Sequence, residues 1–310
     1  MNEPIIRTTQ LTKLYGRKLA LSDLDLEVRR GEVFAFLGPN GAGKTTTIRL
    51  LLDLIRPTNG QAQVFGLNAH SHSAEIRSRT GYLPGNLVMY ENLTGRELLV
   101  FFAHLQGGVD WQFTMDLALR LDVDLDRKIK TLSQGNKQKV GLVQALMGQP
   151  ELLILDEPTA GLDPLVRQEF YAAIREARDR GQTIFLSSHV LAEVERIADR
   201  VAMVRRGRLV LVDEVADLKA KAPRRLELSF NHLAPIDAFR RLPGVTDLSS
   251  EDNILFCKMD GSVDQLVKTA SRYEVTNITS HESDLEEIFL DYYRDTTEEA
   301  TAPEGNEIAG

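Results

Sequence analysis

The sequence predicts an α/β fold in which helices cover a mixed β-sheet, followed by a smaller α+β unit. Up to about residue 222, short apolar runs typical of buried strands alternate with segments of helical spacing. Beyond that point the order of short strands and helices changes to βαββαβ. A length of 310 residues also agrees with about two domains.

The elements of the first part follow from apolar spacing and from the turn residues between them. Alternating apolar residues predict a strand, and apolar residues three or four apart predict a helix. In chain order the expected elements are strands at 5–14, 21–28 and 33–37, a helix from Lys44 that stops before Pro57, a mainly helical region from about 85 to 148, a strand at 152–155, a helix at 164–180, a strand at 183–187 and a helix at 190–198.

The second part is expected to follow a domain boundary near Pro223. Its βαββαβ order is the split-βαβ arrangement of ferredoxin-like domains. The expected elements are strands at 225–230, 245–249, 254–258 and 274–280, helices at 235–242 and 263–271, and a last helix at 284–293. The predicted domains are 1–222 with a helical subdomain at about 86–150, an accessory α+β domain at 223–294, and a disordered acidic tail at 295–310.

Composition limits the classes of function. The formal net charge is −8 and no lysine or arginine tract stands out, so nucleic acid is not an expected partner. A single cysteine, Cys257, excludes an internal disulfide and a multi-cysteine zinc site, which fits a cytoplasmic setting. No apolar run approaches the roughly 18 residues of a membrane span, so another chain would supply any membrane part.

A glycine-rich loop after the strand at 33–37 matches the Walker A pattern G-x-x-x-x-G-K-[ST]. Glycines allow backbone amides to approach a phosphate, and the following helix directs its positive end at the anion. Lys44 is a point charge for the β- and γ-phosphates, and the Thr45 hydroxyl can bind Mg²⁺. The residues expected to bind the nucleotide here are Gly38, Pro39, Asn40, Gly41, Ala42, Gly43, Lys44, Thr45 and Thr46.

Two acids and a histidine follow other predicted strands. Asp156 and Glu157 end the apolar run at 152–155, where strand ends face the ligand crevice of a parallel sheet. Asp156 is expected to hold Mg²⁺, Glu157 to activate the attacking water, and His189 to contact the γ-phosphate. Alone, the acids could be an ordinary strand end and the histidine a structural one; the phosphate loop favours the catalytic interpretation.

Five motifs together resemble the ATP-binding cassette (ABC) family. GPNGAGKTT (38–46), LSQGN (132–136), LLILDEP (152–158), AGLD (160–163) and SSH (187–189) occur in the order of that family. The resemblance covers about residues 4–215. It implies a P-loop NTPase core with an inserted helical subdomain, and hydrolysis of ATP with Mg²⁺.

The resemblance also implies a head-to-tail homodimer with two ATP molecules between the subunits. Ser133 and Gly135 would then contact the γ-phosphate bound to the opposite subunit, and Asp163 would lie in the dimer interface. Ser133 could equally be a simple helix cap. Tyr15 resembles the aromatic residue that stacks on adenine, and an edge-strand tyrosine is the alternative.

The sequence departs from the family pattern at three positions. Gln134 stands where the signature has glycine, and Asn136 where it has glutamine. Gly85 in GYLPG (81–85) stands where the family has a glutamine that touches Mg²⁺ and water. Hydrolysis is expected to tolerate this change if Asp156 and Glu157 dominate.

Three further segments look like the type-2 export class of the family: YLP (82–84), MYENLTGRELL (89–99) and DLEEIFLDYY (284–293). This resemblance implies efflux of a drug, antibiotic or lipid-like substrate through a separate ABC membrane permease, with the chain held at the inner face of the membrane. The residues that could contact the permease, or could instead be core, are Phe101, Phe102, Leu105 and Trp111. The alternatives are a soluble ABC ATPase acting on ribosomes or DNA, and a non-catalytic nucleotide-regulated interaction protein.

Overall fold

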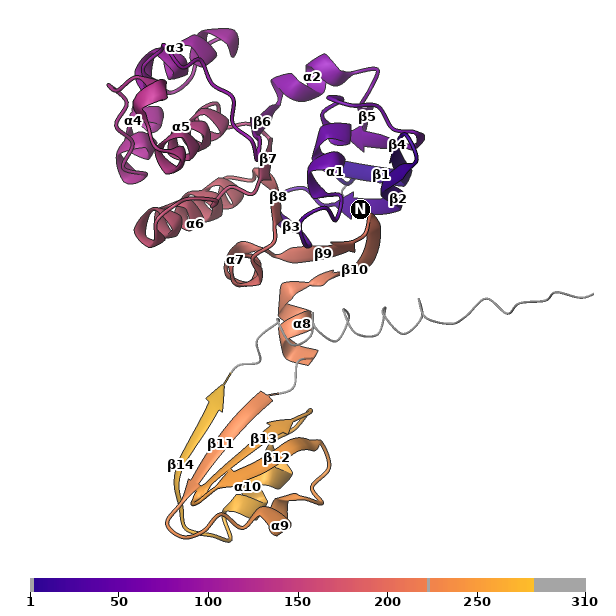
Figure 1. The fold of residues 1–310 in the computed structure, drawn as a ribbon, viewed down its shortest axis with the longest axis vertical. Helices are drawn as coiled ribbons and strands as arrows, with labels where there is room; N and C mark the ends of the chain where they lie inside the picture. Colours follow the sequence, from indigo (N-terminus) through magenta and orange to yellow (C-terminus); the bar gives the residue numbers. More distant parts are fainter. Residues whose placement is uncertain (1–2, 222–223, 282–310) are drawn as a thin grey trace, which may run out of the picture. The chain divides into compact units, whose positions relative to one another are not determined.

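The computed structural model describes residues 3–221 and 224–281 (Figure 1). Internal contacts group the chain into one unit up to Glu214 and a second from Val215 onward. This division precedes helix α8 (Val215–Lys221), whereas the domain boundary expected near residue 223 follows it and stays a prediction. The predicted helix at 284–293 and tail at 295–310 lie outside the described residues.

The elements that apolar spacing predicts are present in the first unit in the expected kind and order, and others are added to them. In chain order the elements are β1 (Ile6–Tyr15), β2 (Lys18–Val28), β3 (Val33–Leu37), α1 (Lys44–Leu51), β4 (Asn59–Val64), β5 (Leu67–Asn68), α2 (Ser73–Ser78), β6 (Thr80–Leu83), α3 (Gly95–Leu105), α4 (Trp111–Arg120), η1 (Ile129–Thr131), α5 (Gln134–Leu146), β7 (Leu152–Asp156), α6 (Pro164–Asp179), β8 (Thr183–Ser188), α7 (Leu191–Ile197), β9 (Arg200–Arg205) and β10 (Arg208–Glu214). The added elements are strands β4, β5, β6, β9 and β10 and the short helix α2.

A six-stranded mixed sheet forms the centre of this unit, with the strand order β10-β9-β3-β8-β7-β6. Neighbours from β9 to β6 run parallel, and β10 pairs antiparallel with β9. Every residue of β3, β7 and β8 is buried, as expected for strands covered on both faces. Since these strands are parallel neighbours, the loops that follow them meet at one edge of the sheet, and the predicted α/β fold is confirmed.

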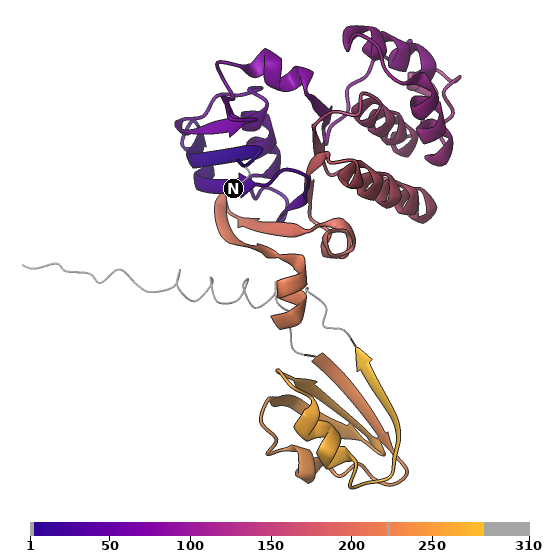
Figure 2. The same ribbon diagram turned by 180° about the vertical axis from the view of Figure 1, so that it is seen from behind.

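A second, antiparallel sheet has the order β2-β1-β4-β5 (Figures 1 and 2). Its apolar side chains share one hydrophobic cluster with α1 and with the central sheet. Ile48 and Leu51 of α1, Leu24 of β2 and Phe36 of β3 are all fully buried in it. Burial of each such side chain contributes about 1.5–3 kcal/mol, so this cluster fixes α1 behind the phosphate loop.

Helices α3, α4 and α5 form a group set apart from the antiparallel sheet (Figure 1). They have a small core of their own, which contains Leu98, Ile129, Leu132 and Val140. The start of α3 is fixed by a capping box between Thr94 and Glu97. These helices lie within the range 86–150 expected for a helical subdomain. Within the part of the chain that is described, every helix is too short or too polar to cross a bilayer.

The second unit contains a four-stranded antiparallel sheet of order β12-β13-β11-β14. Its elements after α8 are β11 (Arg224–Phe230), α9 (Ile236–Phe239), β12 (Val245–Glu251), β13 (Ile254–Met259), α10 (Asp264–Ala270) and β14 (Val275–His281). This is the predicted βαββαβ order. Helix α9 ends at Phe239 and is shorter than the expected 235–242; Pro243 has no amide hydrogen to donate to Phe239 O and disfavours helical backbone at Leu242, so the expected last turn does not continue the helix.

Candidate nucleotide-binding and catalytic site

The loop between β3 and α1 has the geometry of an anion site. Gly43 adopts a left-handed φ of 111°, and a side chain on it would meet Ala20 O at 2.8 Å. No side chain caps α1. The first amides of α1, those of Lys44, Thr45 and Thr46, therefore have no acceptor within the helix and can bind an anion.

A pocket of about 500 Å³ opens beside this loop. It is lined by Tyr15, Lys18, Leu19, Ala20, Pro39, Asn40, Gly41, Gly43, Lys44, Thr45, Thr46 and Glu157. Tyr15 lies at the end of β1, is 46% exposed, and has Lys13 Nζ 5.3 Å from its ring centre. An exposed aromatic face of this kind can stack on a planar base.

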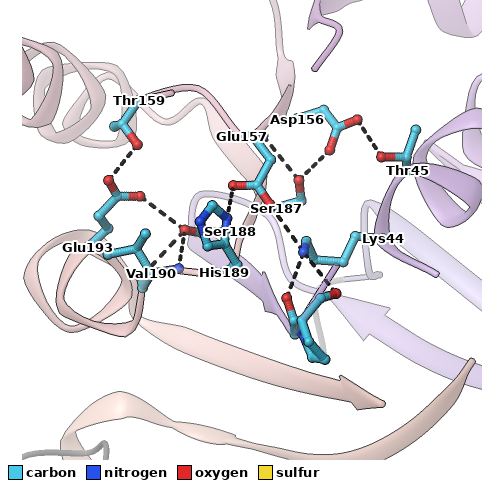
Figure 3. A network of polar contacts seen from close by, with 12 residues as sticks. Lys44, Thr45, Asp156, Glu157, Thr159, Ser187, Ser188, His189, Val190 and Glu193 are labelled. Atoms are coloured by element: carbon cyan, nitrogen blue, oxygen red, sulfur yellow. Dashed lines mark hydrogen bonds and ion pairs between the residues drawn. The ribbon is translucent and has the colours of Figure 1, made fainter. Parts of the chain in front are cut away.

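Lys44 lies inside the pocket with only 6% of its surface exposed. Its ammonium donates to Gly38 O at 2.6 Å and to Pro39 O at 3.3 Å (Figure 3). Glu157 Oε1 lies 3.1 Å from Lys44 Nζ, in an orientation that gives an ion pair without a hydrogen bond. The lysine charge is thus fixed between the loop and the strand-end acid.

Thr45 and Asp156 lie in contact across the sheet edge. The Thr45 hydroxyl donates to Asp156 Oδ2 at 2.8 Å, and the Ser187 hydroxyl donates to Asp156 Oδ1 at 2.5 Å. Burial, and then the Asp156 charge, raise the pKa of Tyr82 above its usual range. A hydroxyl and a carboxylate are hard oxygen donors of the kind that Mg²⁺ prefers, so the pair fits that ion.

Glu157 turns sharply out of β7. Its φ of 50° lies in the left-handed region, which costs a non-glycine residue about 1–3 kcal/mol. The Glu157 amide donates to Ser187 O at 3.2 Å. On its other side, His189 Nδ1 lies 2.7 Å from Glu157 Oε2 (Figure 3). Because an ionised carboxylate only accepts, Nδ1 is assigned the proton in this contact.

Gly85 lies directly against the Asp156 carboxylate at the end of β7. A Cβ at Gly85 would come within 3.0 Å of Asp156 Oδ2. In this structure the space that a side chain at position 85 would need is thus taken by the Asp156 carboxylate.

Ser133, Gly135 and Asp163 form a separate cluster and do not line the pocket of their own chain, as far as the described residues show. The Ser133 hydroxyl accepts from Asn136 N at 3.3 Å, so it caps α5. A Cβ at Gly135 would meet Gly161 O at 2.5 Å, which packs the LSQGN segment tightly against the AGLD loop. Asp163 caps α6, and the bond from the Val166 amide, helped by Lys139, lowers the pKa of its carboxyl.

Sequence reasoning missed three residues that support the site. Ser187 binds Asp156, and its only signal was its place in the SSH motif. Gln138 donates to Pro158 O at 3.1 Å and steadies the turn after Glu157. Lys139 is buried and lies 3.7 Å from Asp163 Oδ2. The sequence around Gln138 and Lys139 gives no signal that separates them from ordinary polar residues of a helix.

Together, the loop, the Thr45–Asp156 pair and the Glu157–His189 pair define an enzyme of the nucleoside triphosphatase class. The ABC transporter family matches residues 21–160. The bacitracin transport ATP-binding protein BcrA of Bacillus licheniformis is 42% identical over 73% of this chain and 75% of its own length. BcrA of Enterococcus faecalis is 33% identical over 93% of this chain and 96% of its own length.

A further relative, the daunorubicin/doxorubicin resistance ATP-binding protein DrrA of Streptomyces peucetius, is 38% identical over 69% of this chain and 67% of its own length. Among solved structures, an ATP-binding subunit of an ABC transporter is 31% identical, with a TM-score of 0.65, over 69% of this chain and 92% of that chain. A dimeric ATP-binding cassette bound to ADP and Pi shares the fold, with 20% identity and a TM-score of 0.62 over 68% and 98% of the two chains. The chain belongs to the ABC transporter ATP-binding proteins and is an ATPase of that family.

Proposed function

We propose that this ATPase powers the export of a drug- or antibiotic-like substrate through a separate membrane permease. The names of three relatives support this, since two act in bacitracin transport and one in resistance to daunorubicin and doxorubicin. A role on ribosomes or DNA is less well supported, because the net charge of −8 disfavours a nucleic-acid surface. The observation that carries the catalytic part is the position of Glu157 between Lys44 and His189.

In this proposal the pocket holds ATP along its length. Tyr15 stacks on the adenine, the amides at the start of α1 bind the phosphates, and Lys44 neutralises charge on the β- and γ-phosphates. Thr45 and Asp156 would hold Mg²⁺, which would neutralise phosphate charge that develops during hydrolysis.

Glu157 is proposed as the general base. The oxygen of the attacking water bonds to the γ-phosphorus while the bond from that phosphorus to ADP breaks, and a water proton passes to the Glu157 carboxylate. Since Glu157 Oε2 binds His189 Nδ1 and Oε1 faces Lys44, the carboxylate is held in a fixed direction. Side chains held this way lose little entropy on reaching the reactive geometry.

A head-to-tail homodimer is proposed to complete the site. Ser133, Gly135 and Asp163 do not line the pocket of their own chain, and a second copy would bring its Ser133 and Gly135 to the γ-phosphate. Ser133 already caps α5, so its hydroxyl, the first amides and the helix dipole share one end of that helix. The interpretations of Ser133 as a cap and as a phosphate ligand are therefore compatible.

The permease is proposed to dock on an apolar surface after β6. Val88, Tyr90, Phe101 and Leu105 are exposed there by 89%, 59%, 41% and 67%. The rings of Tyr90 and Phe101 pack edge to face at 5.6 Å. A neighbouring hollow of about 460 Å³ is lined by Tyr82, Pro84, Leu87, Val88, Met89, Tyr90, Leu98, Phe102 and Gln144. Exposed apolar patches of this kind mark interaction sites.

The four residues that the sequence offered as either permease contacts or core divide between exposed and half-buried positions. Phe101 and Leu105 are exposed, whereas Phe102 is half-buried and packs against the core of the helical group. Trp111 is half-buried at the start of α4. An apolar cytoplasmic segment of the permease would cover the exposed pair and hold the chain at the inner face of the membrane.

Co-expression with a candidate permease tests the proposal. Washed membranes should retain the wild-type chain, whereas Val88→Glu and Leu105→Glu should release it. Leu119→Glu is the matched control, because Leu119 is 80% exposed and lies on α4 outside this surface. Retention of the two docking variants, or co-purification with ribosomes in place of membranes, would contradict the proposal.

A further inference from the structure

Glu193 of α7 is a buried acid next to the turns that follow β7 and β8. It is 5% exposed, and its carboxylate accepts hydrogen bonds from two hydroxyls. Thr159 Oγ1 donates to Oε1 at 2.5 Å, and Ser188 Oγ donates to Oε2 at 3.0 Å (Figure 3). Ser188 Oγ in turn accepts from the Val190 amide at 3.0 Å, so the chain on both sides of His189 is fixed.

The two hydroxyls belong to the two turns that carry the proposed catalytic pair. Thr159 follows Glu157 by two residues, and Ser188 directly precedes His189. Both are buried, at 7% and 0% exposure, so water does not compete for these bonds. Glu193 therefore links the turn after β7 to the turn after β8 without lining the pocket itself.

The link has an unusual composition. Within residues 3–221 and 224–281, no lysine or arginine lies within ion-pair distance of Glu193, so its carboxylate is held by two hydroxyl groups and not by a direct ion pair. Tyr171 of α6 lies in the same buried region; burial and then the Glu193 charge raise its pKa to about 12, although Arg167 and Arg196 act in the opposite direction. Departures of this sort from a stable core concentrate at functional sites.

We propose that Glu193 is a positioning residue for ATP hydrolysis. By binding Thr159 and Ser188 with its two oxygens, it fixes the relative position of the two turns and thereby the 2.7 Å contact between Glu157 and His189. It does not touch the pocket and so acts on the rate of the chemical step rather than on ATP affinity. This inference rests on the proposed roles of Glu157 and His189.

Four substitutions in the full-length chain separate positioning from simple stabilisation. Thr159→Val removes the hydroxyl at constant shape, and Thr159→Ser keeps it. Glu193→Ala removes both acceptors, whereas Glu193→Gln can still bind both hydroxyls after they rotate. For each variant, kcat, the KM for ATP and the melting temperature are measured.

Thr159→Val and Glu193→Ala should each lower kcat by about 10- to 100-fold, the effect of a small misplacement of reacting groups, with the KM changed less than about twofold. Thr159→Ser and Glu193→Gln should restore most of the rate. The double variant Thr159→Val/Glu193→Ala should be no slower than the slower single one, because both changes break the same link.

Wild-type kcat in a folded Glu193→Ala or Thr159→Val variant overturns the inference. A loss of rate that appears only with an equal loss of ATP affinity also overturns it, because that pattern indicates a purely structural role. Glu157→Gln is assayed in parallel. If Glu157→Gln keeps full activity, the proposed role of Glu157 fails; if it is inactive while Glu193→Ala is fully active, only the role of Glu193 fails.

Discussion

The ammonium of Lys44 lies 3.1 Å from one carboxylate oxygen of Glu157. The other carboxylate oxygen lies 2.7 Å from His189 Nδ1. The residue proposed to activate water is therefore held between the phosphate loop and the strand-end histidine, with 22% of its side chain exposed. Its left-handed backbone directs it there.

Glu157→Gln should abolish most ATP hydrolysis. Glutamine keeps the shape but cannot take a proton, so kcat should fall by about 10²- to 10⁴-fold. ATP affinity should persist, since the loop amides and Lys44 are unchanged. Phosphate release and a nucleotide titration check the two parts, and full ATPase activity in this variant would refute the role of Glu157.

Substitutions of Ser133 distinguish its role as a cap of α5 from its proposed role as a phosphate ligand. Ser133→Ala should lower the stability of the chain by about 1 kcal/mol through loss of the cap on α5, and should lower ATPase activity as well. Ser133→Asn restores a cap but not the hydroxyl, so its melting temperature should match the wild type while its activity stays at least about tenfold lower. A fully active Ser133→Asn variant would leave only the capping role.

Gly85→Ala should raise the Mg²⁺ concentration that ATP hydrolysis requires. The added Cβ would lie 3.0 Å from Asp156 Oδ2 and force this carboxylate away from Thr45. Crowding of this kind costs about 1–3 kcal/mol. The Mg²⁺ concentration for half-maximal ATPase activity should rise about tenfold, and the exposed neighbour substitution Asn86→Ala should leave it unchanged. An unchanged Mg²⁺ dependence in Gly85→Ala would contradict this account of the position.

The site could be predicted where a motif coincides with a strand end. Lys44, Asp156 and Glu157 follow buried apolar runs, and parallel strands bring such ends to one edge. The order of the strands could not be predicted, because sequence order does not specify that β8 lies between β3 and β7. The bond from Ser187 to Asp156 depends on that order and was missed.

Other features depend on packing that a single sequence does not reveal. Glutamate rarely adopts a left-handed φ, and nothing in LLILDEP signals the turn at Glu157. Glu193 has the sequence context of a surface acid on a short helix, yet it is buried. By contrast, the βαββαβ order of the second unit was predicted because its apolar alternation is clear; the lengths of α9 and α10 were overestimated, α9 by the larger margin.

Cys257 provides a test of packing in the second unit. It is 4% exposed on β13, and burial raises the pKa of its thiol from 9.0 to about 11. The folded state thus favours the protonated thiol, and this contribution to stability is present below pH 9 and lost as the pH rises towards 11.

At pH 8 a thiol reagent should therefore label the native chain at least about tenfold more slowly than the urea-unfolded chain. Cys257→Ser is the control for labelling elsewhere, since the sequence has one cysteine. Equal labelling rates in the native and unfolded chains would show that the thiol is not buried.

The affinity of Lys44→Ala for ATP with Mg²⁺, measured by titration beside the wild type, tests whether the phosphate loop binds the nucleotide. We expect a loss of affinity of at least about tenfold, because the pocket loses the charge held against Gly38 O and Glu157. A folded Lys44→Ala variant that binds ATP as tightly as the wild type would refute nucleotide binding at this loop.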